Sequence, residues 1–236
     1  MQVSPTSYPN PALTGWRLGP GVQQGNPIYR LMRRFFQVTI GGMWKVRVFD
    51  RCHEPTSGSA LYICNHQSFL DPMLMSFALR RPMNYMARDS LFRSQPFKWM
   101  IETVNAFPVR RNTADTGAIK EAIRRLKAGG QVVIFAEGTR TRDGRIAQFM
   151  PGIAMLAQRF ADWTVPVVID GAFEAWPRTQ ALPSGGSIVV QYAPPIPQHV
   201  VRQISSEEFV RQVRGTLISM QAGIRQRVGR PGLNYD

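Results

Sequence analysis

The chain has 236 residues, of which 44% are hydrophobic, and carries a formal net charge of +14. This length is sufficient for one substantial hydrophobic core, and the apolar content argues against disorder for the body of the chain. The positive charge predicts attraction to an anionic partner such as nucleic acid, acidic lipid or an acidic protein. Only four of the 29 basic residues are lysines. Because arginine binds phosphate through two nitrogens, a phosphate-bearing partner is favoured.

The N-terminal part is predicted to comprise two segments. Residues 1–27 are rich in Pro and Gly and lack both the charged region and the continuous apolar run of a secretory signal, so we expect a loose arm. Residues 28–45 mix Leu31, Phe35, Phe36 and Trp44 with arginines, a pattern typical of an amphipathic helix. Such a helix either docks on an anionic membrane surface or packs on the core. Both alternatives remain open at this point.

No membrane-spanning helix is expected. The uncharged run of the amphipathic segment, residues 35–44, is about half of the roughly 20 residues that a spanning helix needs. The two cysteines, Cys52 and Cys64, are expected to be reduced thiols. We therefore expect a peripheral or monotopic protein on the cytoplasmic face of a membrane.

Short apolar runs alternate with helical patterns along the rest of the chain. Strands are predicted at residues 46–49, 61–64, near 85, 131–136, 165–169 and 188–192, and helices at 71–79, 97–104, 116–128 and from 205 onward. The last helix opens with Ser205 and Glu208 at capping-box spacing. This order predicts one α/β domain, residues 46–229, with a mostly parallel or mixed central sheet flanked by helices. A short tail, residues 230–236, follows it.

Polar residues that follow the predicted strands mark three places, residues 65–71, "FPVRR" at 107–111 and residues 137–140, because ligands in α/β folds bind at the carboxyl ends of strands. In "NHQSFLD", residues 65–71, Asp71 is placed to accept the Nδ1 proton of His66 and leave Nε2 as a general base, although Asp71 could instead cap the next helix. In "EGTR", residues 137–140, a glycine, a hydroxyl and a guanidinium lie together between a strand and the next helix. This composition suits a phosphate site, or an ordinary strand-to-helix turn with an exposed arginine.

Taken in order, "NHQSFLD", "FPVRR", "FAEGTR" and "VPVVI" resemble the motif set of the glycerolipid acyltransferases, the family of 1-acyl-glycerol-3-phosphate acyltransferase and its relatives. The similarity covers residues 60–173, roughly half of the chain. The resemblance implies a catalytic pair, a set of residues for the acceptor phosphate and residues that flank the acyl chain. These are respectively His66 and Asp71; Arg111, Glu137, Gly138, Thr139 and Arg140; and Val165 and Pro166. Many members carry an aspartate where this chain has Arg110, a departure that leaves the identity of the acceptor open.

The resemblance also implies the reaction. An acyl group would pass from acyl-CoA or an acylated carrier protein to the free hydroxyl of a lysophospholipid, with 1-acyl-glycerol-3-phosphate as the leading acceptor and phosphatidate as its product. Glycerol 3-phosphate and a lyso-aminolipid are the alternative acceptors. No cofactor or metal is expected, since His53, His66 and His199 are scattered and the two cysteines lack ligand spacing.

Two functions of other classes are disfavoured by the sequence. A nucleic-acid-binding protein would explain the charge, but the arginines are dispersed, and neither an RNA-binding aromatic signature nor zinc-finger spacing occurs. A serine hydrolase would need a G-x-S-x-G elbow, which is absent. Nucleic acid is therefore not expected as a partner.

Overall fold

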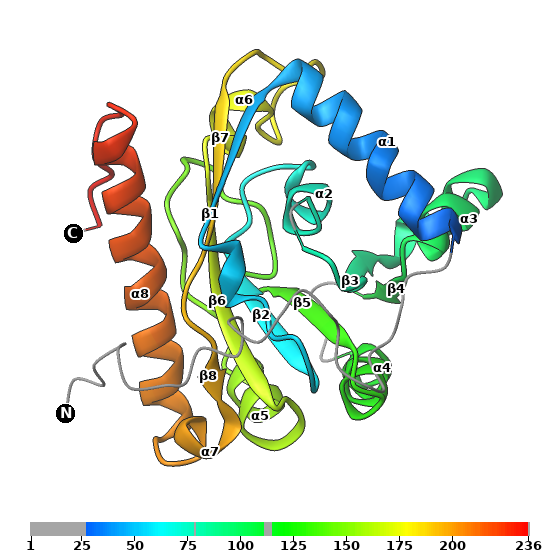
Figure 1. The fold of residues 1–236 in the computed structure, drawn as a ribbon, viewed down its shortest axis with the longest axis vertical. Coiled ribbons are helices and arrows are strands. Elements are labelled where there is room, and N and C mark those ends of the chain that lie inside the picture. Colours follow the sequence, from blue (N-terminus) through cyan, green and yellow to red (C-terminus); the bar gives the residue numbers. More distant parts are fainter. Residues whose placement is uncertain (1–26, 78, 111–114, 236) are drawn as a thin grey trace.

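The central sheet of the protein is mixed, and its strand order is β1-β7-β6-β2-β5-β3-β4, with the short β8 pairing on β6 (Figure 1). The computed structural model describes residues 27–235 apart from 78 and 111–114. The strands are β1 (Lys45–Phe49), β2 (Ala60–Cys64), β3 (Met83–Arg88), β4 (Ala106–Val109), β5 (Gln131–Phe135), β6 (Trp163–Asp170), β7 (Ser187–Tyr192) and β8 (Ile196–Pro197). The helices are α1 (Pro27–Met43), α2 (Asp71–Met75), α3 (Gln95–Thr103), α4 (Thr116–Lys127), α5 (Gly152–Phe160), α6 (Ala172–Ala175), α7 (Gln198–Val201) and α8 (Ser206–Arg227), with 3-10 turns at η2 (Arg51–His53) and η3 (Asp89–Phe92).

Five neighbouring strands, β6, β2, β5, β3 and β4, run parallel to one another, whereas β7 is antiparallel to β6. In the register of the centre, Cys64 at the end of β2 lies opposite Phe135 of β5 and Val167 of β6. The carboxyl ends of the parallel strands therefore open on one edge of the sheet, as predicted for the ligand site. The expected α/β domain with a mixed sheet is confirmed.

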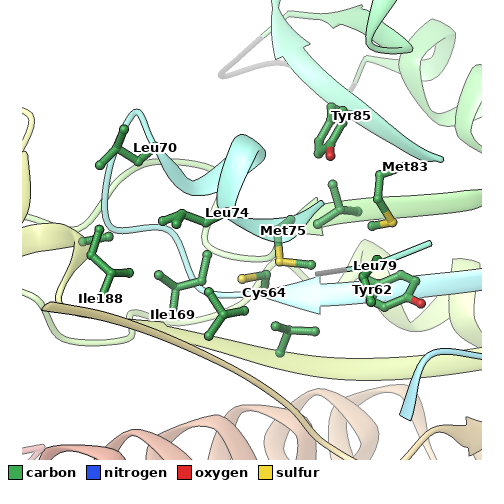
Figure 2. Packing of buried hydrophobic residues seen from close by; sticks show 14 of the residues in the cluster. Tyr62, Cys64, Leu70, Leu74, Met75, Leu79, Met83, Tyr85, Ile169 and Ile188 are labelled. Atoms are coloured by element: carbon green, nitrogen blue, oxygen red, sulfur yellow. The ribbon is translucent and has the colours of Figure 1, made fainter. Parts of the chain in front are cut away.

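Each face of the sheet carries its own hydrophobic core. Alternate residues of β6 point to opposite faces, since Val165, Val167 and Ile169 lie in one cluster and Val168 lies in the other. Helices α1, α2 and α3 contribute to the first cluster, and α4, α5 and α8 contribute to the second. Figure 2 shows Leu74 and Met75 of α2 over the sheet in the first cluster. The edge of the sheet at which the parallel strands end therefore lies between two layers of helices.

Helices α4 and α8 both begin with a side-chain cap, and the sequence predicted the one at Ser205. The Asp115 side chain accepts a hydrogen bond from the Ala118 N–H at the start of α4, and Ser205 Oγ accepts one from the Glu208 N–H at the start of α8. The helix predicted at 71–79 is shorter than expected and ends at Met75. Side chains of α1 bind the carbonyls beyond it, Gln37 at Phe77 and Arg33 at Leu79. The Met75 carbonyl, at the end of α2, accepts a hydrogen bond from the Tyr192 hydroxyl (2.9 Å), so long-range contacts hold the chain both at this end and beyond it.

Helix α1 presents an apolar outer face to solvent. Leu31 is 69% exposed and Phe35 is 56% exposed, whereas Phe36 is partly buried against the first cluster and Trp44 is only 5% exposed. Of the four apolar residues that could have docked on lipid, Leu31, Phe35, Phe36 and Trp44, the last two do not fit that role, because their side chains pack on the protein. Across residues 27–77, 79–110 and 115–235, no helix is both long enough and apolar enough to span a bilayer.

Candidate active site

The turn after β2, residues 65–70, forms the centre of the site and is called the His–Asp turn below. It starts between the ends of β5 and β6, and the side chain of its first residue, Asn65, fixes it to β6. The Asn65 side chain donates to the Ile169 carbonyl (2.9 Å) and accepts from the Ile169 N–H (2.8 Å), so it continues the pairing of β2 with β6. The sequence indicated a polar residue here but gave no role for it.

His66 and Asp71 are in direct contact across the turn. His66 Nδ1 lies 2.6 Å from Asp71 Oδ2, and the same carboxylate oxygen accepts the backbone N–H groups of Gln67 (2.6 Å) and Ser68 (2.8 Å). The imidazole also stacks on the Phe135 ring, with 4.2 Å between centroids. An ionised Asp71 places the proton of a neutral imidazole on Nδ1, so Nε2 is the nitrogen with a lone pair for a substrate proton. The spacing argument correctly anticipated this contact.

Glu137 lies beside this pair but turns its carboxylate to the backbone. Oε1 accepts the N–H of His66 (2.9 Å), and Oε2 accepts the N–H of Ala147 (3.0 Å). Burial raises the pKa of Glu137 to about 7, while the two backbone N–H groups act in the opposite direction. When the Glu137 side chain is ionised, its negative charge would repel a phosphate bound nearby. Its geometry therefore favours a positioning role over direct contact with the acceptor.

The other "EGTR" residues lie in a long loop, residues 136–151, which is called the connecting loop below. The expectation of a short strand-to-helix turn is wrong here, since α5 begins only at Gly152. Gly138 has φ of +69°, and a Cβ there would meet the Met150 sulfur at 3.1 Å, so glycine suits this close approach. Thr139 is exposed. Thr141, the residue after Arg140, donates its N–H to the His66 carbonyl (2.8 Å).

Arg140 and two aromatic residues border the His–Asp turn. The Arg140 guanidinium lies over the Phe69 ring, and Phe69 also packs against Trp176, with 5.6 Å between centroids. Ser68 Oγ donates to the Trp176 carbonyl (2.7 Å), which fastens the segment after α6 to the turn. Sequence reasoning missed Phe69 and Trp176. An aromatic residue between the paired histidine and aspartate was the available clue for Phe69.

The remaining predicted residues lie at different distances from this centre. Val165 and Pro166 are paired with Tyr62 and Ile63 in the middle of the sheet, and Val165 is fully buried. Their proposed place beside an acyl chain stays a prediction. Arg111 lies outside the described residues. Its neighbour Arg110 is exposed just after β4, at the same edge as the His–Asp turn, and its N–H donates to Asp115 (2.8 Å).

The described residues offer no cluster for a metal ion: among positions 27–235 other than 78 and 111–114, no three His, Cys, Asp or Glu side chains gather suitably. The site offers two groups: a histidine base that a carboxylate orients, and a guanidinium that borders the same turn. Such a set can remove a proton from a hydroxyl while an anionic group of the same molecule is held nearby.

Comparison with known proteins gives one family. A family model described as acyltransferase matches residues 45–170, just over half of the chain. A chloroplastic 1-acyl-sn-glycerol-3-phosphate acyltransferase of Arabidopsis thaliana, LPAT1, is 27% identical over 59% of this chain and 40% of its own length. The 1-acyl-sn-glycerol-3-phosphate acyltransferase of Bacillus subtilis is 26% identical over 61% of this chain and 72% of its own. Proteins of Arabidopsis thaliana named glycerol-3-phosphate acyltransferase also match.

A solved structure supports the fold. The crystal structure of the 1-acyl-sn-glycerophosphate acyltransferase PlsC from Thermotoga maritima superposes with a TM-score of 0.73, covering 84% of this chain and 80% of that protein at 22% identity. This chain spans less than half of the length of the plant 1-acyl-sn-glycerol-3-phosphate acyltransferases LPAT1 of Arabidopsis thaliana and BAT2 of Brassica napus.

Proposed function

This chain belongs to the acyltransferase family, and from that premise we propose that it transfers an acyl group from a thioester to the free hydroxyl of 1-acyl-glycerol-3-phosphate, giving phosphatidate. The single observation that carries the proposal is the 2.6 Å contact between His66 Nδ1 and Asp71, beside Arg140 at the open edge of the sheet. The names of the relatives from Arabidopsis thaliana and Bacillus subtilis support the same acceptor.

The reaction needs one base and no covalent enzyme intermediate. His66 Nε2 takes the proton of the acceptor hydroxyl as that oxygen attacks the thioester carbonyl, and the carbonyl electrons move onto its oxygen. The tetrahedral intermediate then collapses, a C–O ester bond replaces the C–S bond, and the thiolate leaves. The imidazolium returns its proton to the thiolate. Asp71 keeps the ring in the required tautomer and stabilises its charged form.

Arg140 is our choice for the phosphate of the acceptor. Its guanidinium carbon lies over the Phe69 ring, and a planar guanidinium binds phosphate oxygens in a bidentate manner. Arg111, Gly138 and Thr139 remain proposed partners of the same phosphate, and Glu137 supports the turn beside them. Glycerol 3-phosphate carries the same phosphate, and relatives with that name exist, so it is the second candidate acceptor.

We also propose that the chain works at a membrane surface on the cytoplasmic side. Its acceptor lipid resists transfer to water by about 0.8 kcal/mol for each CH₂ group, so the enzyme must come to the interface. The exposed apolar face of α1, with Leu31 and Phe35, lies beside the exposed Arg30 and Arg34. Acyl-CoA and acylated carrier protein are both anionic donors that suit the charge of the chain.

The test is an acceptor panel. Purified chain is given 1-acyl-glycerol-3-phosphate, glycerol 3-phosphate or a lyso-aminolipid, each with acyl-CoA or acylated carrier protein, and the lipid products are identified by mass spectrometry. We expect phosphatidate from the first acceptor and its loss in His66→Ala. Product from another acceptor alone would overturn the assignment of the acceptor, and full turnover by His66→Ala would overturn the chemistry.

A further inference from the structure

The connecting loop, which carries Arg140, contacts the His–Asp turn on one side. Thr141 N–H donates to the His66 carbonyl, and Gln67 Nε2 donates to the Gly144 carbonyl (3.3 Å). The loop lies between β5 and α5 without helix or strand of its own. Thr141 and Asp143 hold the middle of the loop by hydrogen bonds within it, including Thr141 Oγ1 to the Arg145 carbonyl (2.8 Å), whereas its position on the protein depends on the groups that bind it from outside.

On the other side, the loop is held by α8 and by the residues that follow this helix. The buried Gln221 donates from Nε2 to the Gly144 carbonyl (3.1 Å). Tyr235 accepts the Ile146 N–H (2.9 Å) through its hydroxyl and donates that hydroxyl to Gln221 Oε1. The Gly144 carbonyl thus receives one hydrogen bond from the His–Asp turn and one from α8.

The segment that brings Tyr235 to the loop, residues 228–235, is fastened by buried charges. Asp170, at the end of β6, forms ion pairs with Arg225 (2.9 Å) and Arg230 (2.5 Å). Arg225 Nε also donates to the Pro231 carbonyl (2.7 Å). Because a buried charge without its partner is strongly unfavourable, these contacts hold the segment in place. Tyr235 therefore reaches the loop from a segment that is itself bound to the core.

We infer that Gln221 and Tyr235 are positioning residues for the acceptor site. They act through the Gly144 carbonyl and the Ile146 N–H, and they fix the connecting loop, with Arg140, relative to His66. Both lie outside residues 45–170, the part matched by the family model. The inference rests on the proposed function in one respect only, that Arg140 serves the acceptor. Loss of the support should impair the acceptor side of the reaction and spare the donor side.

The experiment compares two variants of the full chain. Tyr235→Phe keeps the ring and removes the hydroxyl that binds the loop. The control is Gln212→Met, since Gln212 lies on the exposed side of α8, the helix that carries Gln221, and its side chain donates to Glu208 of that helix rather than to the loop. Steady-state kinetics give KM for acceptor and donor separately, and amide hydrogen exchange follows residues 139–147.

We expect Tyr235→Phe to raise the acceptor KM roughly fivefold, the factor that one lost hydrogen bond corresponds to, with an unchanged donor KM. Exchange at residues 139–147 should become faster in Tyr235→Phe and stay unchanged in Gln212→Met. Unchanged exchange in this loop would overturn the inference, as would an equal rise of both KM values. The exchange measurement needs no substrate. If the wild-type chain does not use the proposed acceptor, the proposed function is refuted. The exchange rates at residues 139–147 still decide whether Tyr235 supports the loop.

Discussion

The guanidinium carbon of Arg140 lies 3.5 Å from the centroid of the Phe69 ring. Phe69 stands between His66 and Asp71 in the sequence, so the residue that carries the ring belongs to the same turn as the base. This contact ties the position of the proposed phosphate ligand to the position of the proposed base. A shift of the turn would move both groups together.

Replacement of Phe69 tests this relationship. Phe69→Leu removes the ring face, and since a cation–π contact is worth about 0.5–2 kcal/mol, we expect the acceptor KM to rise roughly two- to thirtyfold. Phe69→Tyr retains the ring and should stay close to the wild type. Kinetics with varied acceptor at saturating donor measure the effect. An equal loss in the two variants would show that Arg140 does not depend on the ring.

The base and its carboxylate should differ in their effects on stability. His66→Ala should lower turnover by about 10²–10⁴-fold, the usual worth of a general base, and it should lower the melting temperature less than Asp71→Ala does, because it removes the stacked ring but no acceptor of a backbone N–H. Asp71 is 0% exposed and accepts two backbone N–H groups. Asp71→Ala would leave both unpaired, at about 1–3 kcal/mol each, so it should also lower the melting temperature.

Asp71→Asn is the control for that comparison, because its amide oxygen still accepts backbone N–H groups while its charge is lost. We expect it to retain more stability than Asp71→Ala and to remain strongly impaired in turnover. Near wild-type turnover in His66→Ala or Asp71→Asn would contradict the assignment of the pair.

Glu137 should make stability depend on pH in a defined direction. Burial raises its pKa to about 7 from the usual 4.5 of a glutamate side chain, so the folded chain binds this proton more tightly than the unfolded chain. The resulting stabilisation is full below pH 4.5 and is lost as the pH rises toward 7. Relative to Glu137→Gln, the wild type should therefore lose melting temperature between pH 5 and pH 7. Thermal unfolding of both proteins across this range is the measurement, and a constant difference would refute the shift.

The elements that the sequence predicted well are those with strong local patterns. The buried runs that form β2, β5 and β6 and the helices α4 and α8 followed from apolar periodicity, and the start of α8 followed from Ser205. The cap of α4 by Asp115 was not predicted. The His66–Asp71 contact was also predictable, because the spacing and the turn place the two side chains together. Local spacing could not show the partners of Glu137, which are backbone N–H groups of His66 and Ala147.

Long-range contacts account for the other misses. The chain at and beyond the early end of α2 is bound by Tyr192 and by side chains of α1, and Phe36 and Trp44 pack against the first hydrophobic cluster. The support of the connecting loop by Tyr235 joins residues that are far apart in the chain. No periodicity or motif in one sequence encodes such pairings directly, so they required the fold.

The exposed face of α1 gives the last prediction, which concerns binding to lipid. Leu31 and Phe35 point away from the core, so the double variant Leu31→Ser/Phe35→Ser should keep its melting temperature and lose binding to anionic liposomes. Burial of two such side chains in the interface contributes roughly 1.5–3 kcal/mol each when complete, and each arginine near anionic lipid adds about 1 kcal/mol. The change should be visible in flotation at moderate salt.

Phe36→Ser is the matched control, because Phe36 is the neighbouring aromatic residue and packs against the first cluster. We expect it to lower the melting temperature, with a destabilisation of roughly 1–3 kcal/mol for the partly buried ring, while the folded fraction still floats with liposomes. If the double variant instead floats like the wild type and unfolds at a lower temperature, the outer face of α1 is a packing surface, and charge alone brings the chain to the membrane.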